Sequence, residues 1–150
     1  MDEIDIQILD LLSKNARMPI KQISAVVNLS SPAVSSRLEK LEEAGYIRNF
    51  QCQLDQEKVG YPIKAFIHVA MKPNRKPEFY EFIEKIPNVV ECCCVTGDYS
   101  MLIKVAYDST QNLDLFIGQL QKFGDTMTQI VFSTAVEYRQ INLKELSKKN

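Results

Sequence analysis

Residues 29–47 read Leu-Ser-Ser-Pro-Ala-Val-Ser-Ser-Arg-Leu-Glu-Lys-Leu-Glu-Glu-Ala-Gly-Tyr-Ile, and this stretch decides the fold of the first part of the chain. Ser30 or Ser31 can cap a helix, and Pro32 suits the first helical turn that follows. Gly45 is a typical residue for ending the helix. Three apolar residues recur at helical spacing and predict the buried face: Val34, Leu38 and Leu41.

Two shorter helices are predicted before this stretch. Residues 2–15 carry an apolar stripe at Ile4, Ile8, Leu11 and Leu12. Pro19 opens a second helix over residues 20–27, and Asn28 suits the left-handed conformation that ends it. The inward face of this second helix is predicted to hold Ile20, Ile23 and Val27. Three helices in this order predict a helix-turn-helix, whose last helix can enter the major groove of double-stranded DNA.

The charge of this region supports a nucleic-acid partner only locally. Residues 1–60 hold seven Lys/Arg against nine Asp/Glu, whereas residues 14–40 hold five basic residues against one acid. Apolar and polar residues alternate over residues 46–54, and this pattern predicts a strand that would form a wing beside the DNA backbone. The predicted DNA-contacting residues are small, polar or basic: Lys21, Ser31, Ser35, Ser36, Arg37, Lys40, Arg48 and Asn49. A three-helix packing unit without a ligand is the alternative.

The remaining chain predicts an α+β domain. We expect a winged helix-turn-helix over residues 1–54, a linker over residues 55–62 and a second domain over residues 63–150. The second domain has predicted strands at residues 63–71, 89–96, 101–107 and 126–136, with helices at residues 77–85 and after an Asp108-Ser109 cap. This βαββαβ order is the ferredoxin-like sandwich, which leaves one sheet face free of helices. Apolar residues on both strand faces therefore predict a homo-oligomer.

Composition and motifs argue against other classes. No apolar run approaches the roughly 18 residues needed to cross a membrane, and the acidic start predicts a cytoplasmic protein rather than an exported one. Cys52 and Cys92-Cys93-Cys94 lack metal-ligand spacing, and His68 is the only histidine, so neither a metal nor another cofactor is expected. The chain shows no catalytic constellation, so an enzyme is not expected.

Three segments resemble the Lrp/AsnC, or feast/famine, family of transcriptional regulators. They are residues 5–9 with the following Asn15-Ala16-Arg17, residues 29–47, and Cys94-Val95-Thr96-Gly97-Asp98-Tyr99. The resemblance covers nearly the whole chain. It implies an N-terminal DNA reader, a C-terminal (RAM-type) effector domain, dimers that assemble into octamers or similar rings, and an amino acid as effector.

The same resemblance implies an effector site between dimers. Its residues would be Thr96, Gly97, Asp98, Tyr99, Ser100, Met101, Ser133, Thr134 and Val136. Backbone N–H groups near Gly97 could bind a carboxylate, and Asp98 could bind an ammonium group. The family loop commonly reads Gly-Asp-Tyr-Asp, whereas Ser100 stands at the fourth position here. Three alternatives stay open: a plain hairpin turn, an effector-independent architectural DNA-binding protein, and a metabolite-binding oligomer without DNA binding.

Overall fold

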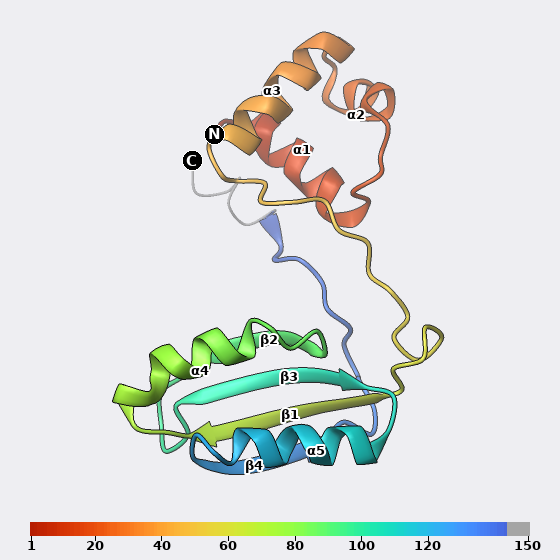
Figure 1. Cartoon of the computed structure of the whole chain (residues 1–150). Helices are drawn as coiled ribbons and strands as arrows, with labels where there is room; N and C mark the ends of the chain where they lie inside the picture. The colour runs from red at the N-terminus through yellow and green to blue at the C-terminus, as the bar shows by residue number, and fades with distance from the viewer. Residues whose placement is uncertain (144–150) are drawn as a thin grey trace. The chain divides into compact units, whose positions relative to one another are not determined.

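The computed structural model describes residues 1–143, and the chain divides into two units (Figure 1). The first unit comprises Met1–Gln53 together with residues from Val136 onward, and the second spans Leu54–Ala135. The predicted second domain ran from residue 63 to residue 150, so this grouping differs from it after Ala135. The last part of that prediction, residues 144–150, lies outside the described residues.

The first unit contains three helices: α1 (Glu3–Lys14), α2 (Ile20–Val27) and α3 (Ser31–Glu43). Asp2 and Asp5 form a reciprocal capping box at the start of α1, each carboxylate accepting a hydrogen bond from the other residue's backbone N–H. Asn28 has φ 55° and ends α2 in the predicted left-handed conformation, while Ser30 caps α3. The shared core of these helices consists of Ile8, Ile23, Val27, Val34 and Leu41.

Two predictions for this unit were wrong. Ile20 is 38% exposed rather than inward, because it lies on the first turn of α2. The wing strand expected over residues 46–54 is not formed, and residues 47–55 have no regular secondary structure. Alternation of apolar and polar residues makes a strand only where a second strand can pair with it, and the described part of the first unit contains none.

The second unit is the predicted ferredoxin-like sandwich. Its elements are β1 (Ile63–Ala70), η1 (Pro73–Arg75), α4 (Lys76–Ile83), β2 (Val89–Cys94), β3 (Met101–Tyr107), α5 (Thr110–Leu120) and β4 (Asp125–Ile130). The four strands form one antiparallel sheet in the order β2-β3-β1-β4. The order of elements and this sheet confirm the α+β class.

The last strand is shorter than predicted. The expected strand over residues 126–136 ends at Ile130, which pairs with Ala65 near the start of β1. One further hydrogen bond joins the Val131 N–H to the Lys64 carbonyl at 2.9 Å. β1 begins at Ile63, so residues beyond Val131 have no neighbouring strand with which to form a ladder.

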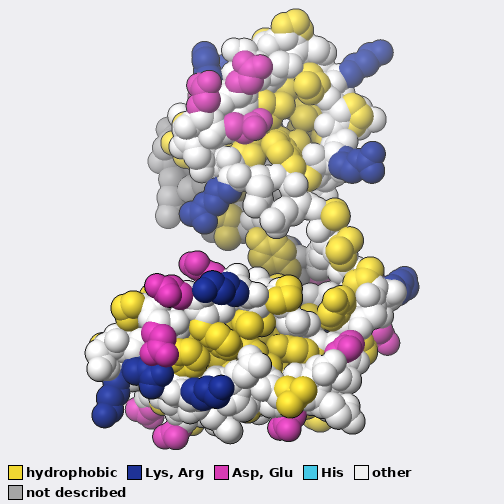
Figure 2. Space-filling model, viewed as in Figure 1, with side chains coloured by type: hydrophobic (Ala, Val, Ile, Leu, Met, Phe, Trp, Pro, Cys, Tyr) yellow, Lys and Arg dark blue, Asp and Glu magenta, His cyan; other side chains and the backbone are white. Residues whose placement is uncertain are grey.

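The two faces of the sheet differ. Helices α4 and α5 cover one face, where Ala65, Ile67, Val69, Ile103 and Val105 are buried in the core. In Figure 2, hydrophobic side chains of this unit gather between the positions that α4 and α5 occupy in Figure 1. The other face, called the open face below, carries residues that alternate with the core positions: Phe66, His68, Cys93, Leu102 and Met127. No helix among the described residues covers it.

The start of β4 imposes a close approach that only glycine permits. A Cβ at Gly124 would lie 1.8 Å from the Ala70 carbonyl oxygen, which is fixed backbone of β1. Gly118, within α5, has open space around the equivalent position.

We therefore predict that Gly124→Ala lowers the free energy of unfolding by about 2 kcal/mol or more, because backbone must move to relieve the overlap. The matched Gly118→Ala variant is expected to raise it by about 0.5–1 kcal/mol through helix propensity. Urea unfolding followed by circular dichroism measures both. Wild-type stability in Gly124→Ala would contradict the predicted packing of β4 on β1.

Candidate nucleic-acid interface and effector loop

The solvent face of α3 presents the side chains that are free to contact another molecule. Ser36 and Lys40 are exposed on this face, and neither side chain has a bonding partner among residues 1–143. They lie four residues apart, so they follow each other along one side of the helix. Lys21 of α2, Arg48 and Asn49 are also exposed, with side chains that make no hydrogen bond or ion pair in the described chain.

Two of the predicted DNA-contacting serines, Ser31 and Ser35, have hydroxyls that bond within the first unit. Ser35 is half-buried, and its hydroxyl donates to the Ser31 carbonyl at 3.1 Å. The Ser31 hydroxyl lies 3.4 Å from the hydroxyl of Ser24, which is buried on α2. The Ser24–Ser31 contact joins α2 to α3, whereas the Ser35 bond lies within α3 itself.

Arg37 links α3 to the start of α1. Its Nη1 donates to the Asp2 and Asp5 carboxylates, each at 2.7 Å. The pKa of Asp2 lies below its ordinary value, first because its carboxylate accepts the Asp5 backbone N–H and second because Arg37 donates to it. The same two carboxylates raise the pKa of Arg37. Direct DNA contact by Arg37 would thus depend on its remaining nitrogen atoms, Nη2 and Nε.

Sequence reasoning missed the part that Asp2 and Asp5 play in this interface. Their three-residue spacing at a helix start signals a capping box. Their contact with Arg37 joins residues more than thirty positions apart, which helical periodicity does not report.

The predicted effector loop joins β2 to β3 and is closed by backbone bonds. The Val95 N–H donates to the Ser100 carbonyl at 2.9 Å, and the Ser100 N–H donates to the Val69 carbonyl at 3.1 Å. Gly97 adopts φ 109°, a conformation suited to glycine. Thr96, Gly97 and Asp98 are exposed, and the Asp98 carboxylate bonds to no residue in the range 1–143. The loop therefore offers a free carboxylate beside an accessible backbone.

Ser100 holds this loop against the end of β1. Its hydroxyl accepts from the Met71 N–H at 3.3 Å and lies 3.4 Å from both the Val69 and the Met71 carbonyl oxygens. Tyr99 is half-buried and contacts His68 edge-to-face, with the ring centroids 5.5 Å apart. The side chains of Ser100 and Tyr99 are thus used in anchoring the loop.

The remaining effector residues are not brought to this loop within the second unit. Met101 is only 1% exposed, and its side chain packs in the core on the helix-covered face. Ser133 and Thr134 follow the end of β4, which pairs with the start of β1, whereas the loop is bonded to the end of β1. Val136 is grouped with the first unit. Ser133, Thr134 and Val136 are exposed and lie beyond the end of β4, outside any strand. Ser133 and Thr134 follow the end of β4 that lies at the opposite end of the sheet from the loop.

The cysteines form no disulfide, and all four are free thiols. Cys92 packs against the core, and burial raises the pKa of its thiol to about 11. Among residues 1–143, no three His, Cys, Asp or Glu side chains are grouped to hold a metal ion. Within the same range, no helix is long and apolar enough to cross a membrane.

A helix-turn-helix with an exposed polar helix face, followed by a separate ferredoxin-like domain, is typical of the two-domain class of DNA-binding proteins. Family comparison agrees for both parts. Residues 1–48 match the winged helix-turn-helix DNA-binding family, and residues 64–141 match the Lrp/AsnC ligand-binding domain family. The chain belongs to the Lrp/AsnC family of DNA-binding transcriptional regulators.

Individual relatives support this assignment over nearly the full chain. The HTH-type transcriptional regulator FL11 of Pyrococcus horikoshii is 33% identical over 147 residues, covering 96% of this chain and 97% of that protein. The structure of Bacillus subtilis LrpC has a TM-score of 0.86 at 26% identity, covering 92% of this chain and 99% of the other. The L-Met complex of the transcriptional regulator NMB0573 from Neisseria meningitidis has a TM-score of 0.91 at 26% identity. The match covers 97% of this chain and 99% of the other. The resemblance to the family is confirmed.

The contrasting contacts of Arg37 and Lys40 lead to a paired prediction. Arg37→Ala should lower the melting temperature, because it removes the link between α3 and the α1 capping box. Lys40→Ala should leave the melting temperature unchanged but weaken DNA binding and reduce the slope of log affinity against log salt by about 1. Differential scanning fluorimetry and fluorescence anisotropy at several salt concentrations measure these effects.

The Arg37 link also has a defined pH dependence. The pKa of Asp2 is lowered in the folded state, so the stability that its carboxylate contributes is present above its ordinary pKa of 3.8 and is lost as the pH falls below that value. The melting-temperature difference between wild type and Arg37→Ala should therefore shrink at acid pH. A difference that stays constant down to pH ~2 would show that the ion pair contributes no stability.

Proposed function

We propose that this regulator reads specific DNA sequences with the exposed face of α3, and that an amino acid bound at the loop of residues 96–101 controls this binding. The observation that carries the proposal is the separation of roles within α3. Ser31, Ser35 and Arg37 are bonded inside the unit, while Ser36 and Lys40 remain free on the solvent face.

The free side chains suit the two tasks of a DNA reader. Ser36 and the exposed Pro32 one turn before it have short side chains, so this part of α3 can approach base edges closely. Lys21, Lys40 and Arg48 carry unpaired positive charge for phosphate contacts, which position the protein without specifying sequence. Asn49 adds a donor and an acceptor for the DNA backbone or a groove edge.

The loop suits a zwitterionic ligand. An amino acid needs N–H donors for its carboxylate and an acceptor for its ammonium group. The exposed backbone around Gly97 can supply the donors, and the unpaired Asp98 carboxylate can supply the acceptor. The bound L-Met of the neisserial relative supports an amino acid as the effector class for this chain.

We further propose that a second copy of the chain completes the site. β1 is eight residues long, so the loop and the residues after β4 are separated by about 20 Å at the strand rise of 3.3 Å per residue. A single amino acid cannot span that distance. Ser133 and Thr134 can therefore contribute to an effector site only if they come from another protomer. The open face offers the apolar surface with which copies can pair.

Coupling then follows from assembly. An amino acid held between copies stabilises the arrangement of copies that binds it best, and this arrangement fixes the separation of the α3 helices. The effector can change DNA affinity only by the difference between its affinities for the competing arrangements.

Effector-independent architectural DNA binding is the second candidate, and one observation favours it. Ser100 replaces the carboxylate that is common in the family loop, and its hydroxyl is already engaged with β1 backbone. The loop therefore has one fewer acceptor for an ammonium group.

A thermal-shift panel of the twenty amino acids on the full chain separates the two candidates. We expect at least one amino acid to raise the melting temperature, because a ligand of the native state stabilises it. The shift should be lost in Asp98→Ala and kept in the control Asp114→Ala, which removes an exposed carboxylate from α5. The same amino acid should change the anisotropy-measured affinity for DNA selected from a random pool.

Each possible outcome of this panel tests a different part of the proposal. No shift with any amino acid, together with selective DNA binding, would favour the architectural candidate. A shift that survives in Asp98→Ala would place the effector elsewhere. Failure to select any DNA sequence would contradict the proposed reading by α3.

A further inference from the structure

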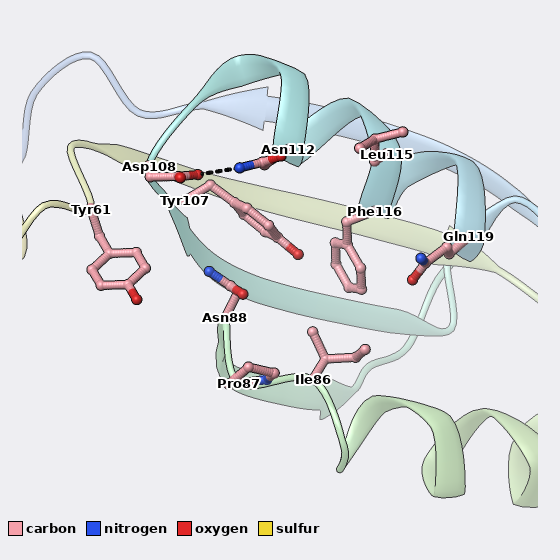
Figure 3. A pocket seen from close by; sticks show the side chains of 10 residues that line it. All are labelled: Tyr61, Ile86, Pro87, Asn88, Tyr107, Asp108, Asn112, Leu115, Phe116 and Gln119. Carbon is pink, nitrogen blue, oxygen red and sulfur yellow. Dashed lines mark hydrogen bonds between the residues drawn. The ribbon is translucent and has the colours of Figure 1, made fainter.

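A cleft in the second unit lies away from the effector loop. It has a volume of about 370 Å³ (Figure 3). Its walls come from Tyr61 before β1, the turn between α4 and β2, the end of β3, and one side of α5. Tyr107, at the end of β3, pairs with Ile63, whereas Met101 beside the effector loop pairs with Val69. The cleft and the loop therefore occupy opposite ends of the sheet. The volume falls within the range of small-molecule sites.

Tyr107 is the buried polar residue of this cleft. It is 6% exposed, and its ring packs against Phe116 with the centroids 5.7 Å apart. Its hydroxyl points into the cleft and forms no hydrogen bond within residues 1–143 (Figure 3). Burial, assisted by the nearby Asp108 charge, raises the pKa of this hydroxyl to about 12, so it remains a neutral donor and acceptor. The hydroxyl is accessible from the cleft, so it can donate to or accept from a molecule bound there.

The charge of the cleft selects the kind of ligand. Asp108 is the one charged residue among those that line it, and its carboxylate accepts a 2.8 Å hydrogen bond from the Asn112 amide (Figure 3). Asn88 donates its amide to the Ala106 carbonyl at 2.9 Å, which leaves its side-chain oxygen as an acceptor. The lining contains no lysine, arginine or histidine that could balance an anion. An ammonium group fits this acceptor-rich site, whereas a carboxylate does not.

The apolar part of the cleft provides space for a hydrophobic body. Phe116 and Ile86 form the wall between α5 and the turn after α4. Leu115, which is 67% exposed, stands at the rim. We propose that this cleft binds a small organic amine without a carboxylate, with its ammonium group near Asp108 and the Tyr107 hydroxyl and its apolar body against Phe116 and Ile86. This site is independent of the amino-acid site at the effector loop.

The probes are phenethylamine and phenylacetate, which share an aromatic body but carry opposite charges. Saturation-transfer-difference NMR titration of the full chain should show phenethylamine binding with a dissociation constant of about 1 mM or tighter. Phenylacetate should not bind. Tyr107→Phe keeps the packed ring and removes only the hydroxyl, and it should weaken phenethylamine binding about fivefold. Asp108→Asn should weaken it about tenfold.

Asp114→Asn changes an exposed carboxylate of α5 that does not line the cleft; it is the matched control and should leave phenethylamine binding unchanged. Asp108→Asn alters an exposed rim residue, so it keeps the test valid if Tyr107→Phe loses stability. Equal binding of phenylacetate, unchanged binding in Asp108→Asn, or no binding of phenethylamine would each overturn the proposal.

Discussion

The open face of the second unit is the constraint on which the rest of the molecule depends. Side chains of a strand alternate between two faces, and α4 and α5 can cover only one of them. The face they leave carries Phe66, Leu102 and Met127, with Met127 37% exposed. The proposed pairing with a second copy would remove this surface from water.

Within the first unit, internal bonds and external contacts are divided between neighbouring positions of one helix. Arg37 joins α3 to the capping box of α1, Ser31 contacts Ser24 of α2, and Ser35 bonds within α3. Ser36 and Lys40 are left free. A binding helix works best when its side chains are held in place by their neighbours, so these internal bonds support the exposed residues of α3.

The sequence predicts what local periodicity controls and misses what depends on distant partners. The helices and the capping residues Asn28 and Ser30 follow from spacing and backbone preference. The strands at residues 46–54 and beyond Ile130 were wrong because alternation cannot reveal whether a neighbouring strand exists. The inward position of Met101 follows from its register on β3. The cleft at Tyr107 escaped prediction because its walls come from segments far apart in the chain.

The most direct test of this account is the mass of the protein in solution, measured by sedimentation for wild type, Leu102→Glu and Leu115→Glu. Leu102 lies on the open face, and Leu115 lies exposed on α5 in the helix layer. We predict a wild-type mass at least twice the chain mass of 17.2 kDa, a fall toward that mass in Leu102→Glu, and no change in Leu115→Glu. A wild-type monomer, or an assembly indifferent to Leu102→Glu, would contradict the proposal that copies pair through the open face.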